Sequence, residues 1–317
     1  MQSNSKKYSR AVIDLGTNTF HLLILDDTNQ VVFELSEAAK IGMAGINQGI
    51  ITDQATSRAV EVLKKFSAKI AEHQIDATNV LAVGTSAVRN ASNQSAFCEA
   101  ILAATGIKVE VITGQQEAAL IYEGVRCALK IGTEPALIID IGGGSVECII
   151  GNDERIFWKQ SFEIGGQRLL ERYMATDPIS ESAVRKMNDY FREVLLPLHN
   201  AYHQYAPTTL IGSSGSFDTL VDLYFMHQRG CLPDPEMASF DLPLHEFNRS
   251  YAQLIAKNRS ERMSMPGMIE LRVEMIVVAV VLVKYILANY TIKNIRVSSF
   301  ALKEGLAALN QPLVAIL

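Results

Sequence analysis

The chain has 317 residues, 48% of them hydrophobic and 20% charged, which is the composition of an ordinary globular protein and not of a disordered or fibrous one. At about 150 residues per domain, this length predicts two domains with cores of their own. The net charge of −5 and the lack of long blocks of one sign exclude a basic surface for nucleic acid or an anionic membrane, so a polyanion would need a focused site.

The N-terminal segment and the cysteines give no sign of export. The first ten residues are polar, so we expect no signal peptide. The longest apolar run, 275–283, has nine residues where a membrane span needs about 20, and we expect it to be a buried core element. The four cysteines include no CxxC pair, which argues against a disulfide framework or a zinc ribbon. We therefore expect a cytoplasmic protein with no membrane partner.

Strand-like apolar runs and helical patterns alternate along the chain, which indicates an α/β fold. A buried strand is predicted where residues 11–25 begin, and 53–71 carries its apolar residues at the 3.6-residue period of a helix. Helices are also predicted at 117–129, after a Thr-Gly start signal, and at 180–198, which opens with the capping pattern SESA. The CLPDPEMAS segment within 226–246 is expected to be a loop or an insertion.

One segment of the first half recurs in the second half of the chain. AVIDLGTNTFHLLIL (11–25) aligns without a gap to LIIDIGGGSVECIIG (137–151), at an offset of 126 that places Asp14 on Asp140. Each copy is a strand that ends in Asp-x-Gly, followed by small residues that let the backbone approach a ligand with its N–H groups inward. A simple hairpin turn needs the glycine but not the carboxylate, so the two aspartates favour a binding site.

A second segment recurs at nearly the same spacing. LAVGTSA (81–87) resembles LIGSSGS (210–216), and the best match, at an offset of 128, places Gly84, Thr85 and Ser86 on Gly212, Ser213 and Ser214. Two segments that recur in this way indicate a duplicated domain. We predict an N-terminal domain over 1–126 and a C-terminal domain over 127–317 that carries most of the insertions.

The usual signatures of nucleotide binding and nucleophilic catalysis are missing from the sequence. It holds no P-loop, no GxGxxG and no GxSxG. His199 and His203 have the i,i+4 spacing of a helix, but without an HExxH context we do not expect them to bind a metal. The chemistry is therefore expected at the polar residues beside the repeated turns.

The second turn, DIGGGSVE, carries a carboxylate inside an apolar run. Strand periodicity places Ser145 and Glu147 on one face. A carboxylate among Val, Cys and Ile is costly to bury unpaired, so Glu147 is expected to face a cleft and to position a metal ion or a water molecule.

Two charged residues and several hydrogen-bond donors follow strands of the first half. Arg89, in GTSAVR, has the geometry to bind a phosphate through two N–H groups. Glu117, in TGQQEA, opens a helix, where a carboxylate is also favoured by the helix dipole alone. The donors beside the turns are Thr17, Asn18, Thr19 and Ser86.

A series of motifs extends from Val12 to about Leu306: DLGTNTFH, GTSAVR, TGQQEA, DIGGGSVE, SFEIGGQR, GSSGS, PGMIELR and VSSFALKEGL. In this order they resemble the exopolyphosphatase / guanosine pentaphosphate phosphohydrolase family, in its short two-domain form. The resemblance implies two ribonuclease-H-like (actin-like) domains, related by duplication and facing each other across a cleft. It also implies a C-terminal end able to pack back on the first domain.

The resemblance further implies roles for individual residues. Glu117 matches the catalytic glutamate that activates water, and Asp140 and Glu147 match the acidic residues that hold Mg²⁺ and help to orient water. Asp14 is a further metal candidate, because it is the counterpart of Asp140 in the repeat. Besides Glu117 and Glu147, Arg89 is predicted to be catalytic, by fixing the terminal phosphate. The predicted phosphate-binding residues are Thr17, Asn18, Ser86, Arg89, Gly143, Gly144 and Ser145.

Some positions depart from the family pattern. Lys40 stands where an arginine is usual, Glu274 replaces an aspartate and Ala279 replaces a glycine. In VSSFALKEGL, Ser299, Phe300 and Ala301 stand in place of the usual Asp-Gly-Gly, and Lys303 in place of an arginine. An Arg-to-Lys change keeps the charge but loses the bidentate geometry, so the preferred substrate length is left open.

We therefore expect a Mg²⁺-dependent hydrolase that releases terminal phosphate from inorganic polyphosphate, from guanosine pentaphosphate, or from both. Two alternatives stay open at this point: an ATP-dependent kinase or ATPase of the same superfamily, and a non-catalytic sensor of polyphosphate or alarmone. Nucleic acid is not an expected partner. Dimers occur in the family, so a homodimer is one assembly that the resemblance implies.

Overall fold

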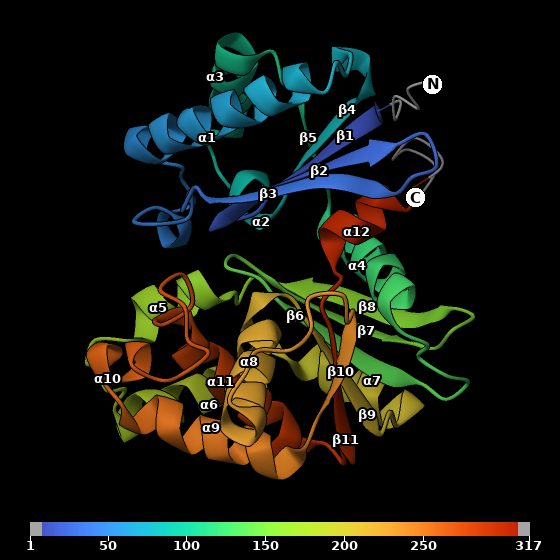
Figure 1. Ribbon diagram of the computed structural model, residues 1–317. Helices are drawn as coiled ribbons and strands as arrows, with labels where there is room; N and C mark the ends of the chain where they lie inside the picture. The colour runs from blue at the N-terminus through green and yellow to red at the C-terminus, as the bar shows by residue number, and fades with distance from the viewer. Residues whose placement is uncertain (1–7, 310–317) are drawn as a thin grey trace. The chain divides into compact units, whose positions relative to one another are not determined.

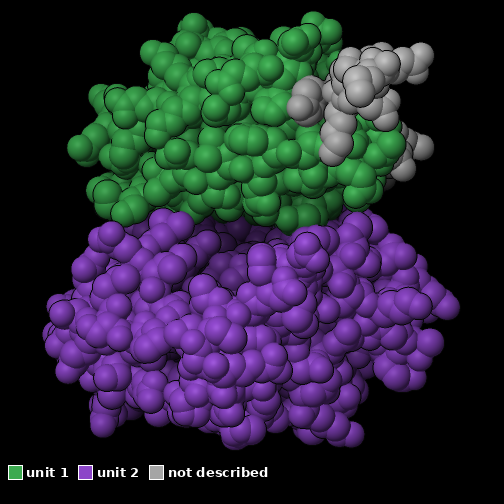
Figure 2. Space-filling view, viewed as in Figure 1, with its two compact units in different colours: residues 1–117, 302–317 green, residues 118–301 purple. Residues whose placement is uncertain are grey.

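The computed structural model describes residues 8–309, which separate into two compact units, shown in different colours in Figure 2. Unit 1 comprises the described residues of Met1–Glu117 and Leu302–Leu317, and unit 2 comprises Ala118–Ala301. Each unit has a buried core of aliphatic and aromatic side chains of its own. Both contain a mixed β-sheet with helices, which confirms the predicted α/β class (Figure 1).

Unit 1 is built on a five-stranded sheet with the order β3-β2-β1-β4-β5. Strands β1 to β3 are antiparallel neighbours, whereas β4 pairs with the other side of β1 in parallel and β5 continues from β4 in parallel. Helices α1 and α3 pack against each other beside this sheet (Figure 1). The elements are β1 (Tyr8–Leu15), β2 (Thr19–Asp26), β3 (Val31–Ala38), η1 (Ile46–Gln48), α1 (Asp53–Glu72), η2 (Ala77–Asn79), β4 (Val80–Gly84), α2 (Ser86–Arg89), α3 (Gln94–Thr105), β5 (Val109–Val111) and α12 (Leu302–Ala307).

Unit 2 is built on a six-stranded sheet with the order β10-β11-β9-β6-β7-β8. Helix α4 (Gly114–Ala128) begins in unit 1 and continues into unit 2. The further elements are β6 (Ala136–Ile141), β7 (Val146–Gly151), β8 (Ile156–Phe162), α5 (Gly166–Tyr173), α6 (Glu181–Val194), α7 (Leu196–Tyr205), β9 (Thr209–Ser213), α8 (Gly215–Arg229), β10 (Ser239–Leu242), α9 (Leu244–Ala256), α10 (Arg259–Met263), α11 (Met275–Asn289) and β11 (Asn294–Ser298).

The two sheets repeat one topology. Strands β8-β7-β6-β9-β11 of unit 2 have the order and the antiparallel and parallel pairings of β3-β2-β1-β4-β5 in unit 1. This agreement confirms the predicted duplication. Unit 2 adds the edge strand β10, which pairs with β11 and begins at the last residue of the irregular CLPDPEMAS segment.

Two of the predicted helical or buried segments have the expected extent. The helix predicted at 53–71 is α1, whose first turn is capped by the Thr52 hydroxyl. The apolar run 275–283 is buried throughout and forms the first part of α11, which packs among α5, α6 and α9. In residues 8–309 no helix combines the length and the apolar character needed to cross a bilayer.

The helix predicted at 180–198 is wrong in one respect, because this segment contains a break. Helix α6 ends before Leu195, and α7 begins at Leu196 with Pro197 in its first turn. Proline has no N–H group and therefore starts a helix more readily than it continues one.

Candidate active site

The glycine turn between β6 and β7 is held by the start of helix α5. The carbonyl oxygens of Gly142, Gly143 and Gly144 accept hydrogen bonds from the first backbone N–H groups of α5 and of the residue before it. A Cβ atom on Gly165 would lie 2.4 Å from the carbonyl carbon of Gly144, so the close approach requires glycine. Among residues 8–309, no hydrogen bond uses the N–H groups of Gly143 or Gly144. The turn therefore has two backbone donors that no residue of the described chain uses.

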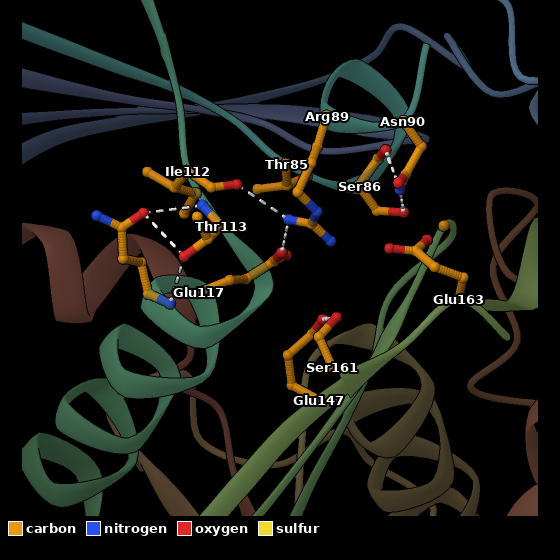
Figure 3. A network of polar contacts seen from close by, with 12 residues as sticks. Thr85, Ser86, Arg89, Asn90, Ile112, Thr113, Glu117, Glu147, Ser161 and Glu163 are labelled. Carbon is orange, nitrogen blue, oxygen red and sulfur yellow. Dashed lines mark hydrogen bonds and ion pairs between the residues drawn. The ribbon is translucent and has the colours of Figure 1, made fainter. Parts of the chain in front are cut away.

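A row of four polar residues crosses the sheet of unit 2 beside this turn. In the register of the sheet, Ser213 lies opposite Asp140, Asp140 opposite Glu147, and Glu147 opposite Ser161. Ser213 Oγ donates to Asp140 Oδ2 at 2.7 Å. Ser161 Oγ donates to Glu147 Oε1 at 2.6 Å, as Figure 3 shows. Asp140 is 6% exposed and Glu147 is 1% exposed. The two predicted metal-binding carboxylates are thus brought together in unit 2.

A half-buried arginine lies next to this row. The guanidinium of Arg272 covers the backbone of Gly215, where a Cβ atom would lie 2.1 Å from Nη2. Burial lowers the pKa of Arg272 from its usual value, and the carboxylates of Asp218 and Asp140 act in the opposite direction. Arg272 therefore supplies positive charge beside Asp140.

Asp140 and Glu147 are the residues of unit 2 that could hold a divalent metal ion. Two buried carboxylates on neighbouring strands repel each other unless a cation or a proton compensates their charge. Within the described part of the chain, no cluster of three or more His, Cys, Asp or Glu side chains could hold a metal ion. A site with two carboxylates still suits Mg²⁺, because this ion keeps several water ligands and takes phosphate oxygens as others.

In unit 1, the start of helix α4 fixes the position of Glu117. The Thr113 hydroxyl accepts from the N–H of Gln116, and Gln116 Oε1 accepts from the N–H of Thr113, so the two residues form a capping box. The helix begins at Gly114, three residues earlier than predicted, and Glu117 stands in its first turn. Glu117 is only 6% exposed. The helix dipole favours a carboxylate at this position, and a second positive charge also lies next to Glu117.

Arg89 contacts Glu117 directly. Arg89 Nη1 donates to Glu117 Oε2 at 2.7 Å and to the carbonyl oxygen of Ile112 at 3.2 Å (Figure 3). Arg89 is the last residue of the short helix α2, which follows the end of β4. The structure therefore brings together two of the predicted catalytic residues, and Nη1 of Arg89 orients the carboxylate of Glu117.

The predicted donors of unit 1 lie in two places. Ser86 begins α2, and its hydroxyl and carbonyl oxygens accept from Asn90 Nδ2 at 3.3 and 2.9 Å. Thr17 and Asn18 lie in the turn between β1 and β2 and are buried. The loop that contains Lys40 covers this turn, because its backbone N–H groups donate to the carbonyl oxygens of both residues.

Asp14 occupies the position in β1 that Asp140 occupies in β6. It lies opposite Val83 on one side and His21 on the other. No second carboxylate stands opposite it in the sheet, so its role as a metal ligand stays a prediction.

Three residues of these sites were not predicted from the sequence. Ser161, Ser213 and Arg272 all lie inside the motifs SFEIGGQR, GSSGS and PGMIELR. The motifs mark the segments but not which side chain meets which carboxylate, since that depends on strand register and on helix packing.

Comparison with known proteins agrees with this geometry. The model of the Ppx/GppA phosphatase family matches residues 24–310. The chain belongs to the Ppx/GppA phosphatase family. This result confirms the family that the motifs resemble, over nearly the whole chain.

Members of the Ppx/GppA family with solved structures share the fold. An exopolyphosphatase from Cytophaga hutchinsonii is 46% identical, with a TM-score of 0.89 over 93% of this chain and 95% of that chain. A family member from Aquifex aeolicus is 24% identical, with a TM-score of 0.75 over 93% of this chain and 95% of that one, and shows the fold alone.

Curated relatives are longer. A guanosine-5'-triphosphate,3'-diphosphate pyrophosphatase of Photobacterium profundum is 31% identical over 226 residues, which are 70% of this chain and 45% of the relative. A bifunctional 3-dehydroquinate synthase/phosphatase of Fusobacterium nucleatum is 30% identical over 68% of this chain and 34% of its own length. The chain thus spans less than half the length of these two relatives.

Proposed function

We propose that this chain is a Mg²⁺-dependent hydrolase that releases the terminal phosphate of inorganic polyphosphate. The observation that carries the proposal is the pair of buried carboxylates, Asp140 and Glu147, next to a glycine turn with two unused backbone N–H groups. The similarity to the Cytophaga hutchinsonii exopolyphosphatase, which extends over almost the full length of both chains, supports polyphosphate as the substrate.

Asp140 and Glu147 would hold the metal ion in this proposal. When bound, Mg²⁺ would neutralise negative charge on the phosphate oxygens. The residues of unit 2 would do the rest of the binding there: the N–H groups of Gly143, Gly144 and Ser145 would donate to the phosphate oxygens. Phosphoryl transfer needs little covalent chemistry from a protein, so charge and position account for most of the catalysis.

Glu117 would take a proton from the attacking water. Its carboxylate is held by Arg89 Nη1 and lies at the start of α4. A carboxylate in a fixed position is a suitable general base for such a step. Arg89 would in addition contact the terminal phosphate, as the sequence predicts.

The test is a phosphate-release assay with polyphosphate, guanosine pentaphosphate and ATP, each titrated with Mg²⁺. We expect release from polyphosphate that requires Mg²⁺, and a loss of about 10²- to 10⁴-fold in Glu117→Gln, which still folds and binds polyphosphate. Release from ATP alone would support the kinase or ATPase alternative. Polyphosphate binding without release would support the sensor.

Guanosine pentaphosphate is the second candidate substrate. The Photobacterium profundum relative, whose name refers to this nucleotide, is 31% identical over 70% of the chain. Preferential release from guanosine pentaphosphate in the same assay would favour this candidate. The cytoplasmic location and the homodimer stay predictions from the sequence.

A further inference from the structure

The row of polar residues in unit 2 has a hydroxyl at each end and the two carboxylates in the middle. It crosses four neighbouring strands, with Ser213 on β9, Asp140 on β6, Glu147 on β7 and Ser161 on β8. Side chains that lie opposite each other in a sheet point to the same face. The neighbouring positions Ile139 and Cys148 belong to the hydrophobic core, so the row lies on the other face of the sheet.

Each serine donates to the carboxylate beside it. A serine hydroxyl has a single proton to donate, and here it is directed at Asp140 Oδ2 from one end and at Glu147 Oε1 from the other. Both distances, 2.7 and 2.6 Å, are those of short hydrogen bonds to an ionised acceptor. A carboxylate is planar, so a hydrogen bond from the serine to one oxygen fixes the plane of the group. The second oxygen is then held away from the serine.

We propose that Ser161 and Ser213 are positioning residues that hold Asp140 and Glu147 in the orientation in which they bind a divalent cation. This proposal rests on the proposed function, which assigns the metal ion to these two carboxylates. Without the serines, two buried carboxylates on adjacent strands would rotate to reduce their repulsion. With them, the site is set before the ion arrives, which lowers the free-energy cost of binding.

A purely structural role for the serines makes a different prediction. If they only satisfied buried polar groups, their removal would lower stability and leave the metal affinity of the folded protein unchanged. Unit 1 offers a matched control, since Ser36 lies opposite His21 in the same position of the repeat, with Ser36 Oγ 2.7 Å from His21 Nδ1. Ser36→Ala removes the same hydroxyl from the copy that has one carboxylate in its row.

The experiment measures Mn²⁺ binding to the full chain by electron paramagnetic resonance, without substrate, next to the melting temperature of each variant. We expect Ser161→Ala and Ser213→Ala to raise the Kd for Mn²⁺ by about 10- to 100-fold. Ser161→Thr, which keeps the hydroxyl, is expected to restore wild-type affinity, and Ser36→Ala to leave it unchanged. Should Ser213→Ala fail to fold, the comparison of Ala and Thr at position 161 decides the question.

Two outcomes would overturn the proposal, and they differ from each other. If Glu147→Gln loses Mn²⁺ but both serine variants bind it as the wild type does, the positioning role is wrong and the proposed function stands. If the wild-type chain does not bind Mn²⁺, both are wrong.

Discussion

The two units place the same strands in the same order, yet the polar rows beside their first turns differ. In unit 1 the row consists of Val83, Asp14, His21 and Ser36, taken from β4 to β3. It contains one carboxylate, and the serine at its end contacts an imidazole. A valine stands where a second hydroxyl would be needed.

In unit 2 the same row consists of Ser213, Asp140, Glu147 and Ser161. Here two carboxylates meet, and each has a hydroxyl donor. The two copies share the backbone frame and the serine of the third strand, but they differ in the number of carboxylates in the row. A single residue, glutamate in place of histidine, accounts for the second carboxylate.

The largest effect is expected from a substitution that gives unit 2 the polar row of unit 1. Glu147→His leaves Asp140 as the one carboxylate of the row. We expect the Kd for Mn²⁺ to rise by roughly 100-fold or more and phosphate release to fall with it, because a metal-binding carboxylate is lost. Equilibrium Mn²⁺ binding measures this effect apart from catalysis. Wild-type affinity in this variant would show that the metal ion lies elsewhere.

Where unit 2 has a pair of carboxylates, unit 1 has the ion pair of Arg89 and Glu117. Arg89→Ala removes the nitrogen that holds Glu117. A hydrogen bond between charged groups is worth about 1.5–3 kcal/mol, so we expect kcat/KM to fall by roughly 10- to 100-fold. Arg126→Lys, on an exposed arginine whose partner Glu123 is half-buried, is the control and is expected to change little. An unchanged kcat/KM in Arg89→Ala would remove this residue from the site.

A third prediction separates the two glycines at the start of α5. Gly165→Ala would push a methyl group against the Gly144 carbonyl carbon, at 2.4 Å, and we expect it to destabilise the fold by about 1–3 kcal/mol. At Gly166 the nearest atoms to an added Cβ are 3.5 Å away, in Met275, so Gly166→Ala is the matched control. Denaturant unfolding compares the two. Equal stability of both variants would mean that the turn adapts without cost.

The smallest effect is expected at Lys303, which lies in α12 of unit 1. Its ammonium pairs with Glu34 on β3 and with Glu304. Burial alone would lower the pKa of Lys303, but these carboxylates raise it above its usual value. A raised pKa means that the stabilisation is present at neutral pH and is lost as the pH rises through the pKa of the folded state.

Lys303→Met is therefore expected to cost roughly 1 kcal/mol at neutral pH, and less at a pH above that pKa. Lys65→Met, at an exposed pair with Glu37 on the same strand β3, is the control and is expected to cost less. Melting temperatures measured across the pH range check both. A cost that is constant at all pH values would mean that packing, and not charge, is lost.

The sequence was sufficient to predict the repeated hairpins and the site residues that belong to a single hairpin. Strand periodicity and the paired Asp-x-Gly turns are local signals, and Asp140 and Glu147 lie on one short hairpin. Partners from distant strands were not predictable. The match of 81–87 to 210–216 aligns Gly84 with Gly212, whereas the sheet places Gly84 opposite Leu15 and Gly212 opposite Ile139.

Such shifts of register do not leave a trace in the sequence pattern, because a shift by two residues keeps every side chain on its face. The same limit applies to Arg89 and Glu117, which are 28 residues apart and meet only through the packing of two helix ends. The break at Leu195 is of a different kind, because Pro197 is itself a local signal: proline favours the first turn of a helix.

The way in which unit 1 is completed has a consequence for synthesis on the ribosome. Arg10, in the first strand, donates to the carbonyl oxygens of Ala307 and Leu309, and α12 packs on β1 and β2. All of unit 2 leaves the ribosome before these last residues do. The unit that is begun first is therefore finished last, and until then the half-buried Arg10 lacks two of its backbone acceptors.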